Sequence, residues 1–476
     1  MKSLTEKGGT LNDELYIRSF HFFGEMNSRV STMMKGVAAM FFVATLVSSL
    51  SFLFGAYAHE KCFYPFCRGV SERGLTDWLD ADAPGPDAHG VHANWKTIRT
   101  GLLEVVVDRV DLPPTGAYAD SYKETAYGDI SPLGTGMVAA TGAGTLYFVD
   151  ENLHPHPVQG RIPFSRDAFD RDTADRHVNQ TWFSVKDILV EERGAGFARL
   201  FASYHHWNTE QQCFTLRLAM TPLTERNGGY AVGAWETIYE AQPCLPLKER
   251  GHTFSGNQAA GRVVSYEEGT VLLSVGDSGF DGIGGEMVIR EPGSSHGKMI
   301  AIDPTTKAAT TVSVGHRNPQ GLHVDAEGTV WSTEHGPQGG DELNIIVKGE
   351  DYGWPYVTYG TKYGAFEWPL AKAGSDHSGY KRPVFAWVPS IGISELTSVR
   401  KPLFQQWRGD LLITSLKTHS LYRTRVREGR VVYVEPIEMP DRIRGIIELS
   451  DGSIAVKCAG GYLARLRPSP KQLALF

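Results

Sequence analysis

Residues 325–334, DAEGTVWSTE, contain the unit that decides the fold: a small or acidic residue, a Gly-Thr or Gly-Ser pair, and then a short apolar strand. The same unit recurs as TGAGTLYFVD at 141–150, YEEGTVLLSV at 266–275 and LSDGSIAVKC at 449–458. In each copy the glycine can supply the positive φ that a tight hairpin needs, and the following strand is rich in β-branched and aromatic residues. Because one hairpin cannot bury both of its faces, such recurrence is typical of the stacked blades of a β-propeller.

The chain keeps the same character from residue 92 onward. Short apolar or alternating runs are separated by Gly, Asp, Asn and Pro, and amphipathic helical stretches are few. An ordinary β-sandwich is the alternative, but the length of this β-rich region favours a propeller. The spacing of the repeats does not set the number of blades. Residues 151–178 are dense in His, Arg and Asp, and we expect a long surface loop there.

The N-terminal part of the chain predicts a membrane anchor. Residues 36–58, GVAAMFFVATLVSSLSFLFGAYA, carry no charge and, as a helix, are long enough to cross a hydrocarbon core of about 30 Å. Arg29 and Lys35 precede this segment, so the positive-inside rule places the tail, residues 1–35, in the cytoplasm. A secretory signal peptide that is cleaved near Ala58 is the alternative.

Both alternatives place the large domain outside the cytoplasm, in the periplasm if the cell is bacterial. Residues 59–91 are rich in Pro, Asp and Gly and are expected to form a stalk, and residues 92–476 are expected to form the propeller. Five cysteines fit an oxidising compartment, although the sequence does not tell which of them pair. A zinc site is not expected, because no second close pair of Cys or His completes the ligand spacing.

The overall charge argues against one class of partner. The formal net charge is −7, so no global basic field predicts nucleic-acid binding. An anionic ligand would have to be held by a local cluster of cations.

The most informative stretch runs from 315 to 356: GHRNPQGLHVDAEGTVWSTEHGPQGGDELNIIVKGEDYGWPY. In its GPQGGDE loop, Gly336 and Pro337 can turn their carbonyl oxygens into a pocket, and Asp341 and Glu342 supply hard oxygen donors nearby. Carbonyl oxygens and a carboxylate suit a hard cation such as calcium. The alternative is a turn whose acidic residues are simply solvated.

The motifs RNPQGL, TEHGP, GGDELN and YGWP of this stretch resemble the signature of the glucose/sorbosone dehydrogenase family, propellers that use pyrroloquinoline quinone. Weaker similarity extends from about residue 134 to residue 466 and includes WVPSIGIS, WRGDLLITSLK and DRIRGI. The resemblance implies an all-β, six-bladed β-propeller in which the quinone lies over the axis and calcium lies against the quinone oxygens.

The resemblance also implies roles for individual residues. The carbonyls of Gly336 and Pro337 would hold calcium, with Asp341 nearby. Contacts to the quinone would come from Arg317, Asn318, Lys417, Arg442 and Arg444. Independently of the family, the two arginines of DRIRGI are two positions apart and would face the same side of a strand, and guanidinium groups bind carboxylates bidentately. The alternative is that these cations are ordinary solvated charges.

Two positions depart from the pattern of the family. The family has a proton-accepting His three residues before a Gly-Arg pair, and here that position is Gln258, in SGNQAAGR. Because an amide does not accept a proton at neutral pH, we consider His252, in ERGHTFSG, as a substitute base; an ordinary loop histidine is the alternative. Gln258, His252 and Arg317 are thus the catalytic candidates. Trp182 aligns with a family glutamine near the quinone and could stack on the flat cofactor or on a substrate; the alternative is that it simply fills the pocket.

Three functions are compatible with these features. The first is a quinone- and calcium-dependent oxidoreductase that transfers hydride from an aldose or a related alcohol to pyrroloquinoline quinone, with a membrane quinone or a soluble carrier as electron acceptor. The second is a catalytically silent extracytoplasmic propeller that binds carbohydrate or a protein partner, which the loss of the usual His favours. The third, a calcium-dependent hydrolase or lactonase, has no second acidic or His site to support it.

Overall fold

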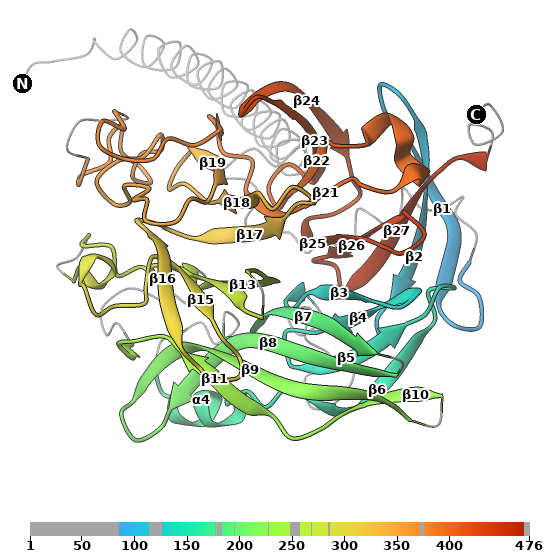
Figure 1. The fold of residues 1–476 in the computed structure, drawn as a ribbon, viewed down its shortest axis with the longest axis horizontal. Helices are drawn as coiled ribbons and strands as arrows, with labels where there is room; N and C mark the ends of the chain where they lie inside the picture. Colours follow the sequence, from blue (N-terminus) through green and yellow to red (C-terminus); the bar gives the residue numbers. More distant parts are fainter. Residues whose placement is uncertain are drawn as a thin grey trace, which may run out of the picture. The chain divides into compact units, whose positions relative to one another are not determined.

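β-Strands make up nearly all of the regular structure, and they form five sheets (Figure 1). The computed structural model describes most of the second of two units in the chain, Asp80–Phe476. The residues that it describes are 85–113, 126–176, 178, 183–194, 196–226, 228–247, 258–267, 269–283, 286–371 and 376–470.

Three of the sheets are four-stranded antiparallel meanders of consecutive strands. The first contains β13 (Ala260–Ser265), β14 (Val271–Val275), β15 (Lys298–Ile302) and β16 (Ala309–Val314). The second contains β17 (Pro319–Val324), β18 (Val330–Glu334), β19 (Asp341–Ile345) and β20 (Phe385–Trp387). The third contains β21 (Ile393–Ser398), β22 (Leu411–Ser415), β23 (Ser420–Arg427) and β24 (Arg430–Glu438).

The ten-stranded sheet consists of two antiparallel groups. One is β3 (Ile130–Leu133), β4 (Gly136–Ala140), β5 (Thr145–Val149) and β6 (Pro155–Arg161). The other is β7 (Val185–Gly194), β8 (Phe197–Asn208), β9 (Cys213–Arg226) and β10 (Gly229–Val232), with β11 (Glu236–Glu240) and β12 (Leu245–Pro246) also paired to β9. A single parallel pair, Ala231 with Gln159, joins the two groups through β10 and β6.

The fifth sheet joins strands from the two ends of the described region. Its order is β1 (Val91–Arg99), β2 (Glu104–Asp111), β27 (Tyr462–Pro468), β26 (Ile454–Cys458) and β25 (Ile443–Glu448). β2 pairs antiparallel with β27 without interruption, from Val105 opposite Pro468 to Asp111 opposite Tyr462. The N-terminal strands therefore complete the sheet that the C-terminal strands begin.

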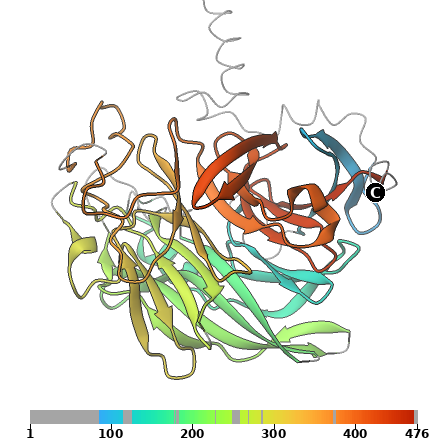
Figure 2. The same ribbon diagram turned by 45° about the horizontal axis from the view of Figure 1, so that its top comes forward.

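The inner strands of these sheets contact one another in a closed ring (Figures 1 and 2). β3 contacts β7, β7 contacts β13, β13 contacts β17, β17 contacts β21, β21 contacts β25, and β25 contacts β3. Apolar side chains fill the space between neighbouring sheets: for example, Trp331 and Leu343 lie in one buried cluster with Ile393 and Ile413 of the next sheet. The fold is therefore mostly β and consistent with a β-propeller.

The predicted hairpin glycines take the conformation that the sequence required. Gly144, Gly269, Gly328 and Gly452 all have φ between 79° and 89°. Three of the four units connect an inner strand to the second strand of its sheet. The unit at 141–150 instead connects β4 to β5, so this copy lies one strand further out than the others.

The expectation of a surface loop at 151–178 was wrong. This stretch contains β6 and a short helix, α4 (Arg166–Asp172). Phe169 of the helix is fully buried, with its ring 4.1 Å from the ring of Phe183 and 5.4 Å from that of Trp207. The Trp207 indole also donates to Asp172 at 2.9 Å, so the helix is held by a buried ring and by hydrogen bonds to β8. Two further short helices among the described residues are η3 (Val288–Arg290) and η4 (Pro402–Trp407).

Cys213 and Cys244 form a disulfide that ties β9 to the segment before β12, which answers part of the pairing that the sequence left open. Cys458 is free and buried. Among the described residues there is no helix long and apolar enough to cross a bilayer. The predicted tail at 1–35 and the predicted span at 36–58 lie outside those residues, as does most of the predicted stalk.

Candidate active site

The first residues of the inner strands meet at one end of the ring. At the start of β13, the Ala260 amide donates to the side-chain oxygen of Asn318, just before β17, at 3.2 Å. Near the start of β21, the Ser394 hydroxyl donates to the Ile443 carbonyl at the start of β25, at 3.0 Å. In an antiparallel meander the second strand ends where the first begins, so the second-to-third connections lie at this end too. We call this end the mouth.

Most of the predicted site residues lie at the mouth. In chain order they are Gln258 before β13, Arg317 and Asn318 before β17, Gly336 and Pro337 between β18 and β19, Asp341 at the start of β19, Lys417 between β22 and β23, and Arg442 and Arg444 at the start of β25. Trp182 and His252 lie outside the described residues, so these two predictions stay untested.

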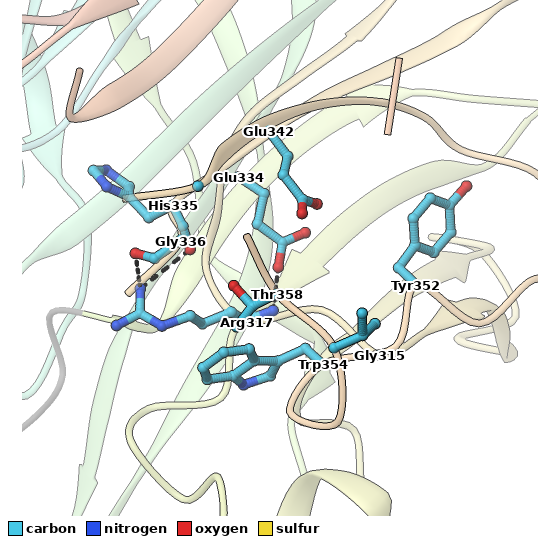
Figure 3. Close-up of a pocket in the computed structure, with 11 residues that line it drawn as sticks. Gly315, Arg317, Glu334, His335, Gly336, Glu342, Tyr352, Trp354 and Thr358 are labelled. Atoms are coloured by element: carbon cyan, nitrogen blue, oxygen red, sulfur yellow. Dashed lines mark hydrogen bonds between the residues drawn. The ribbon is translucent and has the colours of Figure 1, made fainter. Parts of the chain in front are cut away.

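A pocket of about 270 Å³, a volume that includes open solvent at its entrance, lies beside the β18–β19 connection (Figure 3). Its lining includes the side chains of Arg317, Glu334, Glu342 and Trp354 and the backbone of Gly336. Figure 3 shows the two glutamates on the same side of the pocket. Burial raises the pKa of Glu342 to about 8, and the neighbouring Glu334 carboxylate adds to the rise. Glu342 is therefore mostly protonated at neutral pH.

Arg317 links the segment before β17 to the β18–β19 connection. Its Nη1 donates to the carbonyls of His335, at 3.1 Å, and Gly336, at 3.0 Å (Figure 3). Its backbone N–H donates to the Glu334 carboxylate, and its guanidinium carbon lies 5.4 Å from the ring centroid of Trp354. These contacts hold the side chain in one position at the edge of the pocket.

Asp341, the predicted neighbour of calcium, is fully buried, and both of its carboxylate oxygens accept hydrogen bonds from backbone amides. One carboxylate oxygen accepts from the Gly336 amide at 3.2 Å, and the other accepts from the Ile393 amide of β21 at 3.0 Å. This side chain therefore fastens the β18–β19 connection to the next sheet. Within the described part of the chain, no three His, Cys, Asp or Glu side chains form a group that could hold a metal ion.

Cations from two sheets converge on His335. Burial lowers the pKa of His335, and the Asp341 carboxylate opposes this shift. The guanidinium groups of Arg317, Arg444 and Arg442 each lower the pKa further. Arg317 precedes β17, whereas Arg442 immediately precedes β25 and Arg444 is its second residue, so the mouth gathers positive charge from segments that are far apart in the sequence.

Two of these arginines have an N–H donor that forms no hydrogen bond to the described residues. The Nε atoms of Arg317 and Arg444 are buried and have no hydrogen-bond partner within the described residues. Arg444 lies over the ring of Tyr127, with 4.2 Å from its guanidinium carbon to the ring centroid. Buried N–H groups are almost always paired, so a ligand or water is expected to supply the acceptor. Such donors on converging guanidinium groups fit an anion with several carboxylates.

Beneath the mouth, Arg262 of β13 is the centre of a buried ionic cluster. It pairs with Asp129, which precedes β3, and with Glu395 of β21, at 2.9 Å, while Asp187 of β7 lies 3.6 Å away. Its Nη2 also donates to the Arg444 carbonyl at 2.9 Å. Burial raises the pKa of Glu395, and the Arg262 charge opposes the rise. This cluster joins four inner strands beneath the mouth.

Three predicted site residues have simpler surroundings. The Asn318 side-chain oxygen, besides the Ala260 amide, accepts from the Gln320 side chain at 2.9 Å, so it connects two sheets. Lys417 is partly exposed and forms no ion pair among the described residues. The Gln258 side-chain oxygen is buried, and the part of the chain that the structure describes offers it no hydrogen bond.

Two lysines at this centre were not predicted from the sequence. Lys457 of β26 is fully buried and donates to the Tyr127 carbonyl at 2.8 Å; burial and the Arg444 charge lower its pKa to about 7. Lys186 of β7 also has a pKa lowered to about 7, by burial and by Arg444. Both interrupt apolar strand runs, SVKDILV and SIAVKC, and such an interruption was the available signal, since lysine is mostly an exposed residue.

The ring of sheets places the protein among mostly β folds and is consistent with a β-propeller. A family model described as Glucose / Sorbosone dehydrogenase matches residues 143–464, which is more than half of the chain. The chain therefore belongs to the glucose/sorbosone dehydrogenase family, as its motifs predicted.

Two curated relatives share about a third of the aligned residues. The aldose sugar dehydrogenase YliI of Escherichia coli (strain K12) is 31% identical over 247 residues, which are 49% of this chain and 64% of that protein. An uncharacterized protein of Synechocystis, slr1608, is 31% identical over 293 residues, which are 57% of this chain and 66% of that protein. The chain thus spans just under two thirds of the length of each.

Solved structures show the same fold. The soluble aldose sugar dehydrogenase from Escherichia coli, in its apo form, superimposes with a TM-score of 0.59 at 23% identity and covers 72% of this chain and 95% of that one. The aldose sugar dehydrogenase from Streptomyces coelicolor in its PQQ-bound form gives a TM-score of 0.52 at 16% identity, over 77% of this chain and 98% of that one. At these identities the likeness concerns the fold alone.

Proposed function

We propose that this chain is a quinone-dependent oxidoreductase that removes hydride from an aldose or a related alcohol. The observation that carries the proposal is that Arg317, Arg442 and Arg444 lie together at the mouth. The Nε–H groups of Arg317 and Arg444 are buried and have no hydrogen-bond acceptor among the described residues. Pyrroloquinoline quinone is a flat tricarboxylate, and planar guanidinium groups bind carboxylates bidentately. Membership of the family supports the same assignment, and the Streptomyces coelicolor protein of this fold is described in a PQQ-bound form.

The quinone, when bound, supplies the hydride acceptor. The residues of the chain would bind and orient it. Arg442 and Arg444 would hold its carboxylates, with Lys417 at their side. Arg317 and Asn318 would contact its ring system, and both are already fixed in place by hydrogen bonds to the β18–β19 connection and to β13.

We further infer that calcium joins the quinone at the carbonyls of Gly336 and Pro337, with Asp341 close by. Oxygen donors of this kind suit calcium, whose coordination geometry is flexible. In the structure the Gly336 carbonyl accepts a hydrogen bond from Arg317, so a calcium ion would have to share or displace that contact.

Six blades and an extracytoplasmic location complete the proposal. The blade number is supported by the ring of β3, β7, β13, β17, β21 and β25, each of which is the inner strand of a separate antiparallel group. An anchor at 36–58 would hold this domain outside the cytoplasm, near a membrane quinone or a soluble carrier that receives the electrons. Secretion after cleavage near Ala58 is the alternative.

A second function is favoured by one observation, the glutamine at position 258. Without a base there, the same mouth could bind carbohydrate or a protein partner and transfer no hydride. One experiment separates the two. The full-length chain is incubated with calcium and pyrroloquinoline quinone, and bound-quinone absorbance and dye reduction are recorded for a panel of aldoses. Binding and reduction are expected, binding without reduction favours the silent propeller, and the absence of binding overturns the cofactor assignment.

A further inference from the structure

Lys186 lies beside the segment that carries Gln258. It is the second residue of the inner strand β7, and its side chain packs over Gly261, three residues after Gln258. A Cβ atom added to Gly261 would lie 2.7 Å from the Cβ and 2.9 Å from the Cγ of Lys186. The glycine therefore leaves the room that the lysine side chain occupies between the two inner strands.

The amine of Lys186 points toward the residues that open β7 and β3. Its Nζ donates to the Ser184 hydroxyl at 3.2 Å and lies 5.6 Å from the centroid of the Tyr127 ring. Arg444 contacts the same ring. The amine thus lies near Arg444 through the shared Tyr127 ring, while the stem of the lysine packs against Gly261 in the segment that follows Gln258.

The charges around Lys186 favour its neutral form. Burial and the Arg444 cation lower its pKa to about 7. Asp187, the next residue, is turned to the Arg262 cluster, where it accepts from the Val263 amide at 2.8 Å. Among the described residues, the titratable and charged groups on the packed elements include Arg444 of β25, Arg262 of β13, Asp187 of β7, Lys457 of β26, Tyr127 and Asp129 before β3, and His205 of β8, whose Nδ1 accepts from the Ser184 amide at 3.3 Å. Lys457 is fully buried beneath the mouth, whereas Lys186 is partly exposed.

We propose that Lys186 is the general base of this protein and replaces the family's histidine. The proposal rests on the proposed oxidoreductase function. The substrate hydroxyl gives its proton to the neutral Nζ, which becomes an ammonium group. The C–H bond of the same carbon breaks, its hydrogen leaves with both electrons for the quinone, and the carbon–oxygen double bond forms. Two electrons and one hydrogen nucleus reach the quinone, and one proton reaches the lysine, so the step balances.

Three variants test this role in the full-length protein loaded with quinone and calcium. Lys186→Met removes the base, and general-base loss lowers kcat/KM by about 10²- to 10⁴-fold. Lys186→Arg keeps the positive charge but cannot accept a proton, so we expect an equal loss. The double variant Lys186→Met/Gln258→His places a histidine at the position of the family's base. Its kcat/KM should be at least about tenfold higher than that of Lys186→Met. Lys348→Met, at an exposed lysine, is the matched control.

A measurement that needs no quinone tests the role of Lys186 independently of the cofactor assignment. The lysines of the apo protein are dimethylated with ¹³C-formaldehyde, and the resonance that Lys186→Arg lacks is titrated by NMR. We expect a midpoint near 7, and kcat/KM of the loaded enzyme should rise with pH through the same midpoint.

Several results would overturn the proposal. They are a midpoint near 10, full activity of Lys186→Arg, or a Lys186→Met variant whose only defect is weaker quinone binding, which would make the lysine a ligand of the cofactor. Quinone binding by the unmodified protein is measured in parallel. If it is absent, the proposed function fails, and the NMR titration still decides whether Lys186 has the properties of a base.

Discussion

The guanidinium group of Arg317 donates to the Gly336 carbonyl at 3.0 Å, and this carbonyl is the oxygen that the resemblance assigns to calcium. One cation therefore already occupies the place where a second is expected. A guanidinium group and a calcium ion repel each other at such distances unless an anion lies between them. Quinone and calcium should accordingly bind together, since the quinone brings the negative charge.

Arg317→Met should strengthen calcium binding to the protein without quinone. Removing the guanidinium group frees the Gly336 carbonyl and removes a like charge, and we expect at least a tenfold gain in affinity. Isothermal titration of the apo protein with calcium measures it, and Arg430→Met, at an exposed position of β24, is the control. Equal calcium affinity in both variants would show that Arg317 does not compete with the ion.

Arg442→Ala combined with Arg444→Ala should weaken quinone binding by at least about 100-fold, because hydrogen bonds to charged groups contribute about 1.5–3 kcal/mol each. The melting temperature should barely change, since both side chains are partly exposed and the Arg444 carbonyl that Arg262 binds is retained. Quinone titration and thermal unfolding test the two statements. A large loss of stability with unaltered quinone affinity would make these arginines structural.

Arg262→Met should destabilise the ring. The substitution leaves Asp129 and Glu395 buried without their cation, and breaking a buried ion pair in this way costs about 3–5 kcal/mol of unfolding free energy. Arg193→Met, which removes the exposed partner of Glu191, should cost less than about 1 kcal/mol. Chemical denaturation gives both values, and similar costs would contradict the central role of the cluster.

Lys457 makes stability depend on pH. Its pKa is about 7 in the folded protein and near the ordinary 10.5 in the unfolded chain. Between these values the unfolded chain binds a proton that the folded protein lacks, so the free energy of unfolding rises with pH, by at most about 1.4 kcal/mol per pH unit. Lys457→Met should reduce that slope between pH 7 and pH 10, whereas Lys348→Met should not. The slope should persist in part because Lys186 titrates in the same range. A slope that Lys457→Met leaves unchanged would refute the assignment.

The fold was predictable because its signals are local. A glycine at a turn and β-branched residues after it are read from ten consecutive residues, and Gly144, Gly269, Gly328 and Gly452 all adopt the expected φ. The helix α4 was not predictable in this way. Its charged residues suggest a loop, whereas the packing of Phe169 against Phe183 and Trp207 and the hydrogen bond from the Trp207 indole to Asp172 hold it in place.

The site was predictable only in part, for the same reason. Arg317, Arg442 and Arg444 were found through motifs, and the structure brings them together around His335. The ion-pair partners of Arg262 could not be predicted, because they lie on or next to three other strands and no spacing in the sequence relates them. Lys186 was overlooked because a lysine in a strand usually faces solvent, and its neighbours become apparent only when the ring is closed.

The pairing of β2 with β27 sets the moment at which the domain becomes complete during synthesis. β2 leaves the ribosome early and has no antiparallel partner on this side until the last strand of the ring has been translated. Until then its edge is open to strands of other chains, which is the usual route to aggregation. A prematurely terminated chain that lacks β27 would keep this edge exposed. The unpaired strand would distinguish a truncated chain from a finished one, and proteolytic quality control would recognise it.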